Sequence, residues 1–119
     1  MMNLKKITSI TVYCSSSNKI SENYKEQARK MGIFLGQKKI KLVYGGGSNG
    51  LMGEVAKSVK KQNGYVIGII PKFLIEKEGL DDHIDDKIIV DNMSERKKLL
   101  FDKADAFIAL PGGAGTIEE

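Results

Sequence analysis

Several residue types that mark common classes of protein are scarce in this chain. It has one cysteine, one histidine and no tryptophan among 119 residues. A lone Cys14 excludes an intramolecular disulfide, and a lone His83 leaves no metal-ligand cluster of recognisable spacing. The apolar stretches are far shorter than the roughly 20 residues that a membrane-spanning helix needs. We therefore expect a cytoplasmic protein without a metal, a cofactor or a membrane partner.

Arginine is also rare, although the chain is basic overall. The formal net charge is +4, and only Arg29 and Arg96 among the 19 basic residues are arginines. The lysines are scattered over predicted helix faces, where solvation is their expected role. Nucleic-acid binders usually cluster their lysines and arginines and interleave them with aromatic residues. We therefore expect no nucleic-acid partner.

Short apolar runs alternate with segments of helical spacing along the chain. Strands are expected at residues 7–13, 41–44, 65–70, 88–90 and 106–110. Helices are expected from Ser21 to about Gln37, over residues 51–59, and from Ser94 to near Lys103. This alternation predicts a Rossmann-like α/β fold, a three-layer αβα arrangement around a mostly parallel sheet of five strands. Residues 1–119 are expected to form a single nucleotide-binding domain.

Local signals refine these boundaries. Ser21 and Ser94 are predicted to cap their helices through their side chains. Pro71 is predicted to stop the third strand because it has no N–H for a ladder. The third long helix is expected to present Leu99, Leu100 and Phe101 to the core. Residues 76–87 carry eight charged side chains around His83 and are expected to form a surface connection.

Glycine is concentrated in two loops, each placed between a predicted strand and a predicted helix. Glycine lets a backbone approach a ligand closely, and a helix N-terminus offers N–H groups and a favourable dipole to an anion. Two such loops at one sheet edge favour a phosphate-bearing ligand, although each loop can also be read as a tight turn only. The eight glycines are Gly45, Gly46, Gly47, Gly50 and Gly53, then Gly112, Gly113 and Gly115.

The first loop does not fit the common dinucleotide or triphosphate motifs. Gly45-x-Gly47-x-x-Gly50 matches the dinucleotide fingerprint formally, but it follows the second strand and not the first. The next strand ends in Ile69-Ile70-Pro71, where a ribose-binding acid should stand. No Gly-Lys-Ser/Thr follows the glycines, which excludes a P-loop. The pattern therefore favours a mononucleotide.

The second loop adds side chains that can act chemically. Thr116 supplies a hydroxyl donor, and Glu118 and Glu119 fall in the first turn of the expected helix. Both acids can simply favour the helix dipole, which is the interpretation we prefer for Glu118. Consecutive helical residues point about 100° apart, so at most one of the two carboxylates faces a bound sugar.

The motifs together resemble the LOG (Lonely-guy) family of nucleoside 5′-monophosphate phosphoribohydrolases. The family signature Pro-Gly-Gly-x-Gly-Thr-x-x-Glu ends at Glu119, and its upstream Arg-Lys pair falls on Arg96 and Lys97. The remaining matches lie in Cys14-Ser15-Ser16-Ser17, in Tyr44-Gly45-Gly46-Gly47-Ser48-Asn49-Gly50-Leu51-Met52-Gly53, in Gly68-Ile69-Ile70-Pro71 and in Met93-Ser94-Glu95-Arg96-Lys97.

The resemblance implies hydrolysis of AMP, or of an N⁶-modified AMP, to the free base and ribose 5-phosphate. Arg96 and Glu119 inherit the catalytic roles, because a carboxylate can stabilise the positive sugar and orient a water, and an arginine can hold the phosphate or ribose. The remaining substrate-binding residues are Gly112, Gly113, Gly115 and Thr116 at the phosphate, Gly46, Gly47, Ser48 and Met52 along the ribose and base, Ser15 and Ser16 as hydroxyl contacts, Met93 near the base, and Lys97 beside Arg96.

Each of these assignments has a structural alternative. Arg96 can be a solvated helix residue or the partner of Glu95 or Asp102. Met52 and Met93 can be core residues. Cys14 is expected to be structural, because no histidine partner stands near it in any motif.

Family members have been labelled lysine decarboxylases, a label that no residue pattern here supports. They continue beyond the position of Glu119 and form homodimers, so we expect a chain that is incomplete at its C-terminus and a homodimeric assembly. The competing hypothesis is a non-catalytic carrier of a nucleotide or of a cofactor of the molybdenum-cofactor type on the same scaffold.

Overall fold

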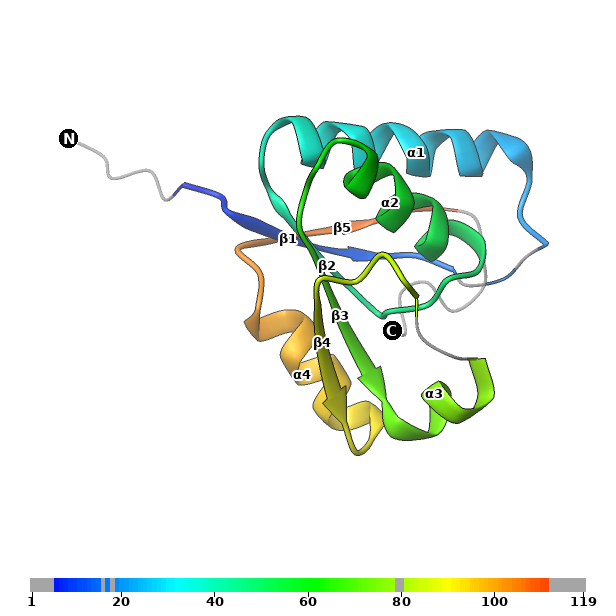
Figure 1. The fold of residues 1–119 in the computed structure, drawn as a ribbon, viewed down its shortest axis with the longest axis vertical. Helices are drawn as coiled ribbons and strands as arrows, with labels where there is room; N and C mark the ends of the chain where they lie inside the picture. Colours follow the sequence, from blue (N-terminus) through cyan, green and yellow to red (C-terminus); the bar gives the residue numbers. More distant parts are fainter. Residues whose placement is uncertain (1–5, 16, 18, 79–80, 112–119) are drawn as a thin grey trace.

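Strands and helices alternate along the chain in the computed structural model, which describes residues 6–15, 17, 19–78 and 81–111. The five strands pair in the order β4-β3-β2-β1-β5, and all four pairings are parallel (Figure 1). The predicted fold class is therefore confirmed. The elements are β1 (Ser9–Tyr13), α1 (Glu22–Gln37), β2 (Lys41–Tyr44), α2 (Gly50–Lys61), β3 (Val66–Pro71), α3 (Lys72–Glu78), β4 (Asp86–Val90), α4 (Met93–Asp102) and β5 (Ala106–Ala109).

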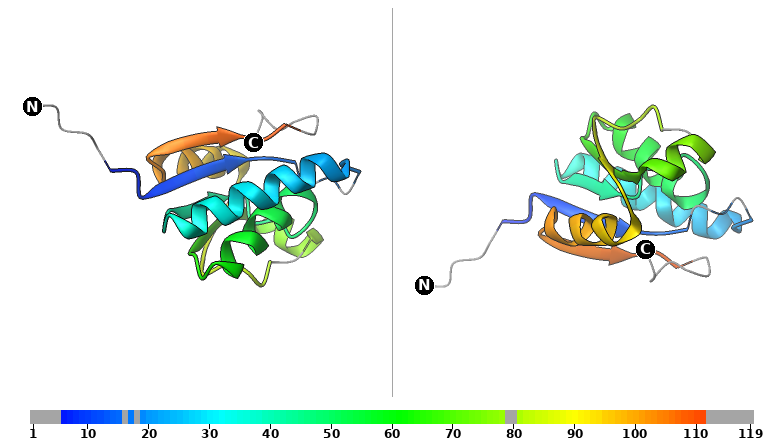
Figure 2. Two further views of the ribbon diagram at one scale, coloured as in Figure 1. Left: turned by 90° about the horizontal axis from the view of Figure 1, so that it is seen from above. Right: turned by 90° about the horizontal axis from the view of Figure 1, so that it is seen from below.

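The strand order explains why helices cover both faces of the sheet. From β1 to β4 each strand is added on the same side of its predecessor, and right-handed crossovers then place the connecting helices on one face. The chain next returns from β4 to β5 on the far side of β1, which puts α4 on the opposite face. Seen from above and from below in Figure 2, α1 and α2 (cyan to green) lie on one side of the sheet and α4 (gold) lies on the other, in agreement with the two separate cores. This is the expected three-layer arrangement.

Side chains of successive strand residues enter two separate cores, as the two-residue period of a strand requires. Leu42 and Tyr44 belong to the larger core under α1 and α2, whereas Val43 between them belongs to the smaller core under α4. In β3, Val66 and Ile70 face the larger core and Ile69 faces the smaller one. Because both faces are covered, these strands read as continuous apolar runs and not as alternating patterns.

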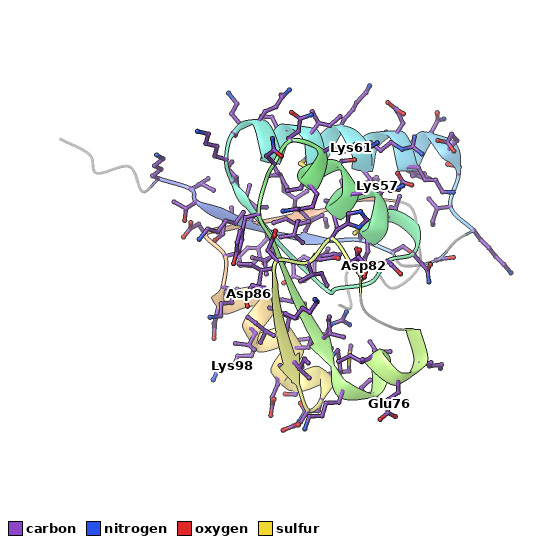
Figure 3. All side chains as sticks on the ribbon, in the orientation of Figure 1. Lys57, Lys61, Glu76, Asp82, Asp86 and Lys98 are labelled. Carbon is purple, nitrogen blue, oxygen red and sulfur yellow. The ribbon has the colours of Figure 1, made fainter. Side chains whose placement is uncertain are left out.

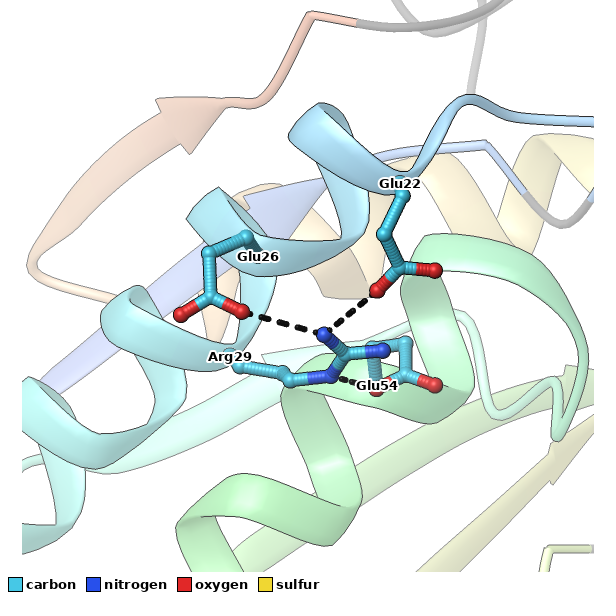
Figure 4. Close-up of polar contacts among 4 residues, drawn as sticks. All are labelled: Glu22, Glu26, Arg29 and Glu54. Atoms are coloured by element: carbon cyan, nitrogen blue, oxygen red, sulfur yellow. Dashed lines mark hydrogen bonds and ion pairs between the residues drawn. The ribbon is translucent and has the colours of Figure 1, made fainter.

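Helices α1 and α2 pack closely because glycines of α1 face α2. A Cβ added to Gly32 would lie 2.5 Å from the Val55 carbonyl oxygen and 2.6 Å from Ser58 Cβ. Arg29 joins the two helices at the surface, donating to Glu54 of α2 at 2.7 Å and to Glu22 and Glu26 of its own helix at 2.8 and 3.1 Å (Figure 4). The hydrogen bond from Arg29 is the main cause that lowers the pKa of Glu22.

Most charged side chains project from the outer surfaces of the elements. Lys57 and Lys61 extend from α2, Lys98 extends from α4, and Glu76 extends from α3 (Figure 3). This distribution agrees with the expected solvation role of the lysines. Among the described residues, no helix is long and apolar enough to cross a membrane.

The structure corrects two predicted helix caps. Asn92, not Ser94, is the N-cap of α4, and its side-chain oxygen accepts a hydrogen bond from the Glu95 N–H at 2.9 Å. Ser94 lies within the first turn because the helix already begins at Met93, where the Asn92 side chain supplies the capping oxygen. Ser21 does stand at the N-cap of α1, but its side chain makes no capping hydrogen bond.

One strand end matches its prediction and two further expectations differ from the structure. Pro71 ends β3 as predicted, although it belongs to the strand as its last residue and pairs in register with Val90, because a strand end does not need the proline N–H. Phe101 is 63% exposed and stacks on Phe107 of the edge strand β5, with ring centroids 5.0 Å apart, so it does not enter the core. The charged segment 76–87 is not wholly superficial, since its Asp81 and Ile84 are buried.

Candidate active site

The carboxyl ends of all five strands meet at one edge of the sheet, because every pairing is parallel. Strand order reverses between β1 and β5, so the loops that follow these two strands flank a topological switch point. In open α/β sheets ligands bind in the crevice at such a point. The loop after β1 begins at Cys14 and Ser15. The loop after β5 contains the second glycine cluster, which lies outside the described residues.

The first glycine loop does not leave the α2 N-terminus open. The Leu51 and Met52 N–H groups both donate to the Ser15 carbonyl oxygen, at 2.9 and 3.3 Å. A helix N-terminus binds an anion through N–H groups of its first turn, and here two of them are already occupied by protein. Between the two glycine loops, this favours the one at residues 112–116 for a phosphate.

Gly46 brings the backbone of the first loop close to β3. Its φ is +84°, a conformation that L side chains rarely adopt, and a Cβ added there would collide with the Ile70 side chain. The loop therefore folds tightly against the strand ends. This close approach explains why residue 46, the second after β2, is a glycine.

Arg96 is the central side chain of this edge. Although it is charged, it is only 5% exposed. Its Nε donates to the Ile69 carbonyl oxygen of β3 at 3.1 Å and its Nη2 donates to the Gly45 carbonyl oxygen after β2 at 2.6 Å. Its Nη1 lies 3.8 Å from Met93 Sδ. The guanidinium group thus carries a permanent positive charge over the ends of two strands.

Helix α4 positions Arg96 through contacts at both of its ends. Asn92 caps its first turn, and Thr11 of β1 donates to the Leu100 carbonyl oxygen in its last turn at 2.5 Å. Thr11 is fully buried, so this hydrogen bond is sheltered from water. Because Arg96 itself is only 5% exposed, the alternative that it is a solvated residue is wrong.

The other predicted substrate-binding residues lie at different depths. Ser15 is buried, and its Oγ accepts a hydrogen bond from the Ser17 N–H at 3.0 Å. Met52 is also buried and belongs to the larger core, in agreement with the alternative that it is a core residue. Gly46 is buried, Gly47 and Met93 are half-buried, and Ser48 and Lys97 are exposed. Six further predicted residues lie outside the described part of the chain: Ser16, Gly112, Gly113, Gly115, Thr116 and Glu119.

A buried polar cluster adjoins the first loop, and no sequence pattern singled it out. Tyr44 donates to Asp81 Oδ2 at 2.8 Å, and Asp81 Oδ1 accepts from the His83 backbone N–H at 2.9 Å and lies 2.7 Å from His83 Nδ1. Burial raises the pKa of the Tyr44 hydroxyl, and the negative charge of Asp81 raises it further. Asp81 and His83 also line a cavity of about 190 Å³ beside Ser48 and Gly50.

The described residues of this edge offer neither an exposed thiol nor a group of metal ligands. Within the described ranges, no group of three or more histidine, cysteine, aspartate or glutamate side chains is arranged to hold a metal ion. Cys14 is fully buried and packs in the larger core. Its burial agrees with the structural role expected for it.

The fold and this edge define a Rossmann-type α/β protein with a buried arginine at the carboxyl ends of its strands. Residues 52–119 match the family model described as "possible lysine decarboxylase". The chain is 46% identical over 110 residues to a probable cytokinin riboside 5′-monophosphate phosphoribohydrolase of Oryza sativa subsp. japonica, and 46% identical over 110 residues to a cytokinin riboside 5′-monophosphate phosphoribohydrolase of Arabidopsis thaliana. The chain belongs to this family, the LOG family.

The similarity covers most of this chain but only part of its relatives. The two alignments include 92% of the chain, and 48% and 51% of the rice and Arabidopsis proteins respectively. The chain therefore spans about half the length of the curated relatives it matches. Among solved structures, the molybdenum cofactor carrier protein of Chlamydomonas reinhardtii superposes with a TM-score of 0.81 at 25% identity, covering 96% of this chain and 68% of the carrier.

Proposed function

We propose that this protein hydrolyses the N-glycosidic bond of adenosine 5′-monophosphate or of an N⁶-modified form of it. The observation that carries the proposal is the position of Arg96. It lies buried at the carboxyl edge of a parallel sheet, where this fold binds ligands, in a chain that is 46% identical to curated phosphoribohydrolases. A permanent cation at that place suits the phosphate or ribose of a nucleotide.

The proposed reaction uses water and releases two products. A water oxygen forms a bond to C1′ of the ribose, and the bond between C1′ and the base nitrogen breaks with its electron pair going to the base. The water loses one proton as it bonds to C1′, the base takes up one proton and leaves as the free base, and ribose 5-phosphate remains. Positive charge builds on the sugar as the bond breaks, so Glu119 stabilises that charge and orients the water.

We assign the phosphate to the second glycine loop, with Gly112, Gly113, Gly115 and Thr116. The first loop is assigned to the ribose and base side, with Gly46, Gly47 and Ser48. Occupation of the Leu51 and Met52 N–H groups by the Ser15 carbonyl oxygen supports this division. Met93, next to Arg96, and Lys97 complete the proposed site, together with the Ser15 and Ser16 hydroxyl groups. We place Met52 behind the site, since it is buried in the core.

Chromatographic detection of free base tests the proposal. Purified protein is incubated with AMP and, separately, with isopentenyladenosine monophosphate, and we expect free base and ribose 5-phosphate in equal amounts. Glu119→Gln should abolish turnover and leave nucleotide binding largely intact. Glu118→Gln is the matched control and should keep its turnover, because a neighbouring helical residue points about 100° away. Turnover that survives Glu119→Gln would show that the catalytic carboxylate lies elsewhere.

A carrier function is the second candidate, and the superposition on the Chlamydomonas carrier favours it. A carrier would bind a nucleotide or cofactor without breaking it. The same assay separates the two functions, because nucleotide binding without release of base at micromolar protein supports the carrier and rejects the hydrolase. We prefer the hydrolase, since identity to the phosphoribohydrolases is nearly twice the identity to the carrier.

We infer further that the protein forms a homodimer, which membership of the family implies, and that it acts in the cytoplasm, which its lone cysteine and short apolar runs favour. Molar mass by light scattering at micromolar concentration tests the assembly. A mass of one chain under those conditions would reject the dimer.

A further inference from the structure

Gly45 and Arg96 approach each other more closely than a side chain at residue 45 would allow. Nη2 of Arg96 donates to the Gly45 carbonyl oxygen at 2.6 Å, so the guanidinium group lies directly against this residue. A Cβ added to Gly45 would overlap with Nη2, would lie 3.0 Å from Arg96 Cζ and would lie 3.1 Å from Met52 Cε. Ordinary contacts between such atoms are about 3.5–4.0 Å. The guanidinium group therefore occupies space that exists only because residue 45 lacks a side chain.

Residue 46 requires glycine because of its backbone conformation, whereas residue 45 requires glycine because of the space beside it. Among the described glycines, Gly46 and Gly50 have positive φ angles, of 84° and 60°, and Gly45 does not. An alanine at residue 45 is therefore compatible with the backbone. The atoms it would meet are the ends of two flexible side chains, which can move aside. The expected consequence of a Cβ is a displaced arginine in a folded protein.

We propose that Gly45 is a positioning residue for Arg96 at the strand ends. Its missing side chain leaves the space in which the guanidinium group lies, and its carbonyl oxygen accepts a hydrogen bond from that group. This role rests on the proposed function, because the position of Arg96 affects nucleotide hydrolysis only if the protein is a hydrolase. Ile69 supplies the second carbonyl, on Nε, and Met93 lies against Nη1. Of these three described residues, Gly45 alone combines an acceptor with the space in which the group lies.

The first test follows Arg96 directly and needs no turnover. The chain has two arginines, so a proton–nitrogen correlation spectrum contains at most two Nε–H resonances, which Arg96→Ala assigns. Gly45→Ala should shift or broaden the Arg96 resonance and leave that of Arg29 unchanged. Arg29 is a suitable internal control because it is bound to Glu54 on the far face of the sheet. An unchanged Arg96 resonance in folded Gly45→Ala would overturn the proposal.

The second test measures activity in two backgrounds. In the wild type, Gly45→Ala should lower kcat/KM for AMP by about 10- to 100-fold, the loss expected when a hydrogen bond to a charged group is broken. In the Arg96→Ala background the same change should have no further effect, because no guanidinium group remains to be displaced. An equal loss in both backgrounds would contradict a role through Arg96.

Thermal unfolding shows whether the substitution at residue 45 disrupts the fold. Gly45→Ala should lower the unfolding midpoint no more than Arg96→Ala does, and a larger fall would mean that residue 45 serves the fold and not the arginine. If the wild type releases no base, the proposed function fails, and the spectra alone decide whether Gly45 positions Arg96.

Discussion

Replacing Tyr44 by phenylalanine should destabilise the protein by about 2 kcal/mol. The lost hydrogen bond joins the Tyr44 hydroxyl to Asp81 Oδ2 at 2.8 Å, between side chains that are 0% and 3% exposed. Hydrogen bonds to charged groups contribute about 1.5–3 kcal/mol. The remaining oxygen of Asp81 keeps its contacts with His83, so the carboxylate is not left without donors. For a chain of this size the loss corresponds to a fall of roughly 8 °C in the unfolding midpoint.

The same substitution should change how stability depends on pH. Burial raises the pKa of Tyr44 in the folded protein, whereas an unfolded chain has the usual tyrosine pKa of about 10. Below about pH 10 the hydroxyl is neutral in both states and its contribution is fully present. Above that pH only the unfolded state loses the proton, so stability falls by about 1.4 kcal/mol per pH unit.

Urea unfolding at pH 7 and between pH 9.5 and 11 measures both effects. Tyr44→Phe should be less stable at pH 7 and should show a shallower decline at high pH. Tyr24→Phe is the matched control, because its ring is 38% exposed, and it should behave like the wild type. A Tyr44→Phe variant with wild-type stability at pH 7 and the wild-type decline above pH 10 would refute the reasoning.

Three further substitutions test the packing and the surface network. Gly32→Ala should destabilise by roughly 3 kcal/mol or more in chemical unfolding, because its Cβ would press on the Val55 backbone of the neighbouring helix, which cannot move aside like a side chain. Thr11→Val should cost about 1–2 kcal/mol in the same assay, since the Leu100 carbonyl oxygen loses a buried donor. Arg29→Gln should leave stability close to that of the wild type, and added salt should shrink any difference, because exposed ion pairs contribute little. A large, salt-independent loss would show that the α1–α2 junction depends on that arginine.

The sequence predicted the architecture well because its apolar runs and its glycine loops alternate with regularity. Strand β2 was predicted with its observed bounds, and the strand ends meet at one edge as expected. The prediction that Arg96 belongs to this edge came from its motif. Its burial and its hydrogen bonds to two carbonyl oxygens were not predicted, because every residue has a backbone oxygen and the residue types do not show which one is contacted.

The remaining differences have physical causes that local patterns do not carry. Asp81 is one of eight charged residues in the segment 76–87, and the approach of Tyr44 from a distant strand distinguishes it. Phe101 looks like a core residue by its hydrophobicity, yet it stacks on the edge strand because β5 has no further strand beside it among the described residues. Asn92 and Ser94 are both good caps, and the choice between them depends on the backbone where α4 begins.

Release of free base from AMP by the wild type and by an arginine variant tests the central claim most directly. Arg96→Gln should lower the rate of base release by about 100- to 1000-fold, the loss typical when one preorganised charged donor is removed from an active site. Arg29→Gln removes the only other arginine and should leave the rate within about twofold, since ordinary surface changes barely affect the fold. Base release that is absent in the wild type, or equal in Arg96→Gln, would contradict the claim that this sheet edge hydrolyses a nucleotide.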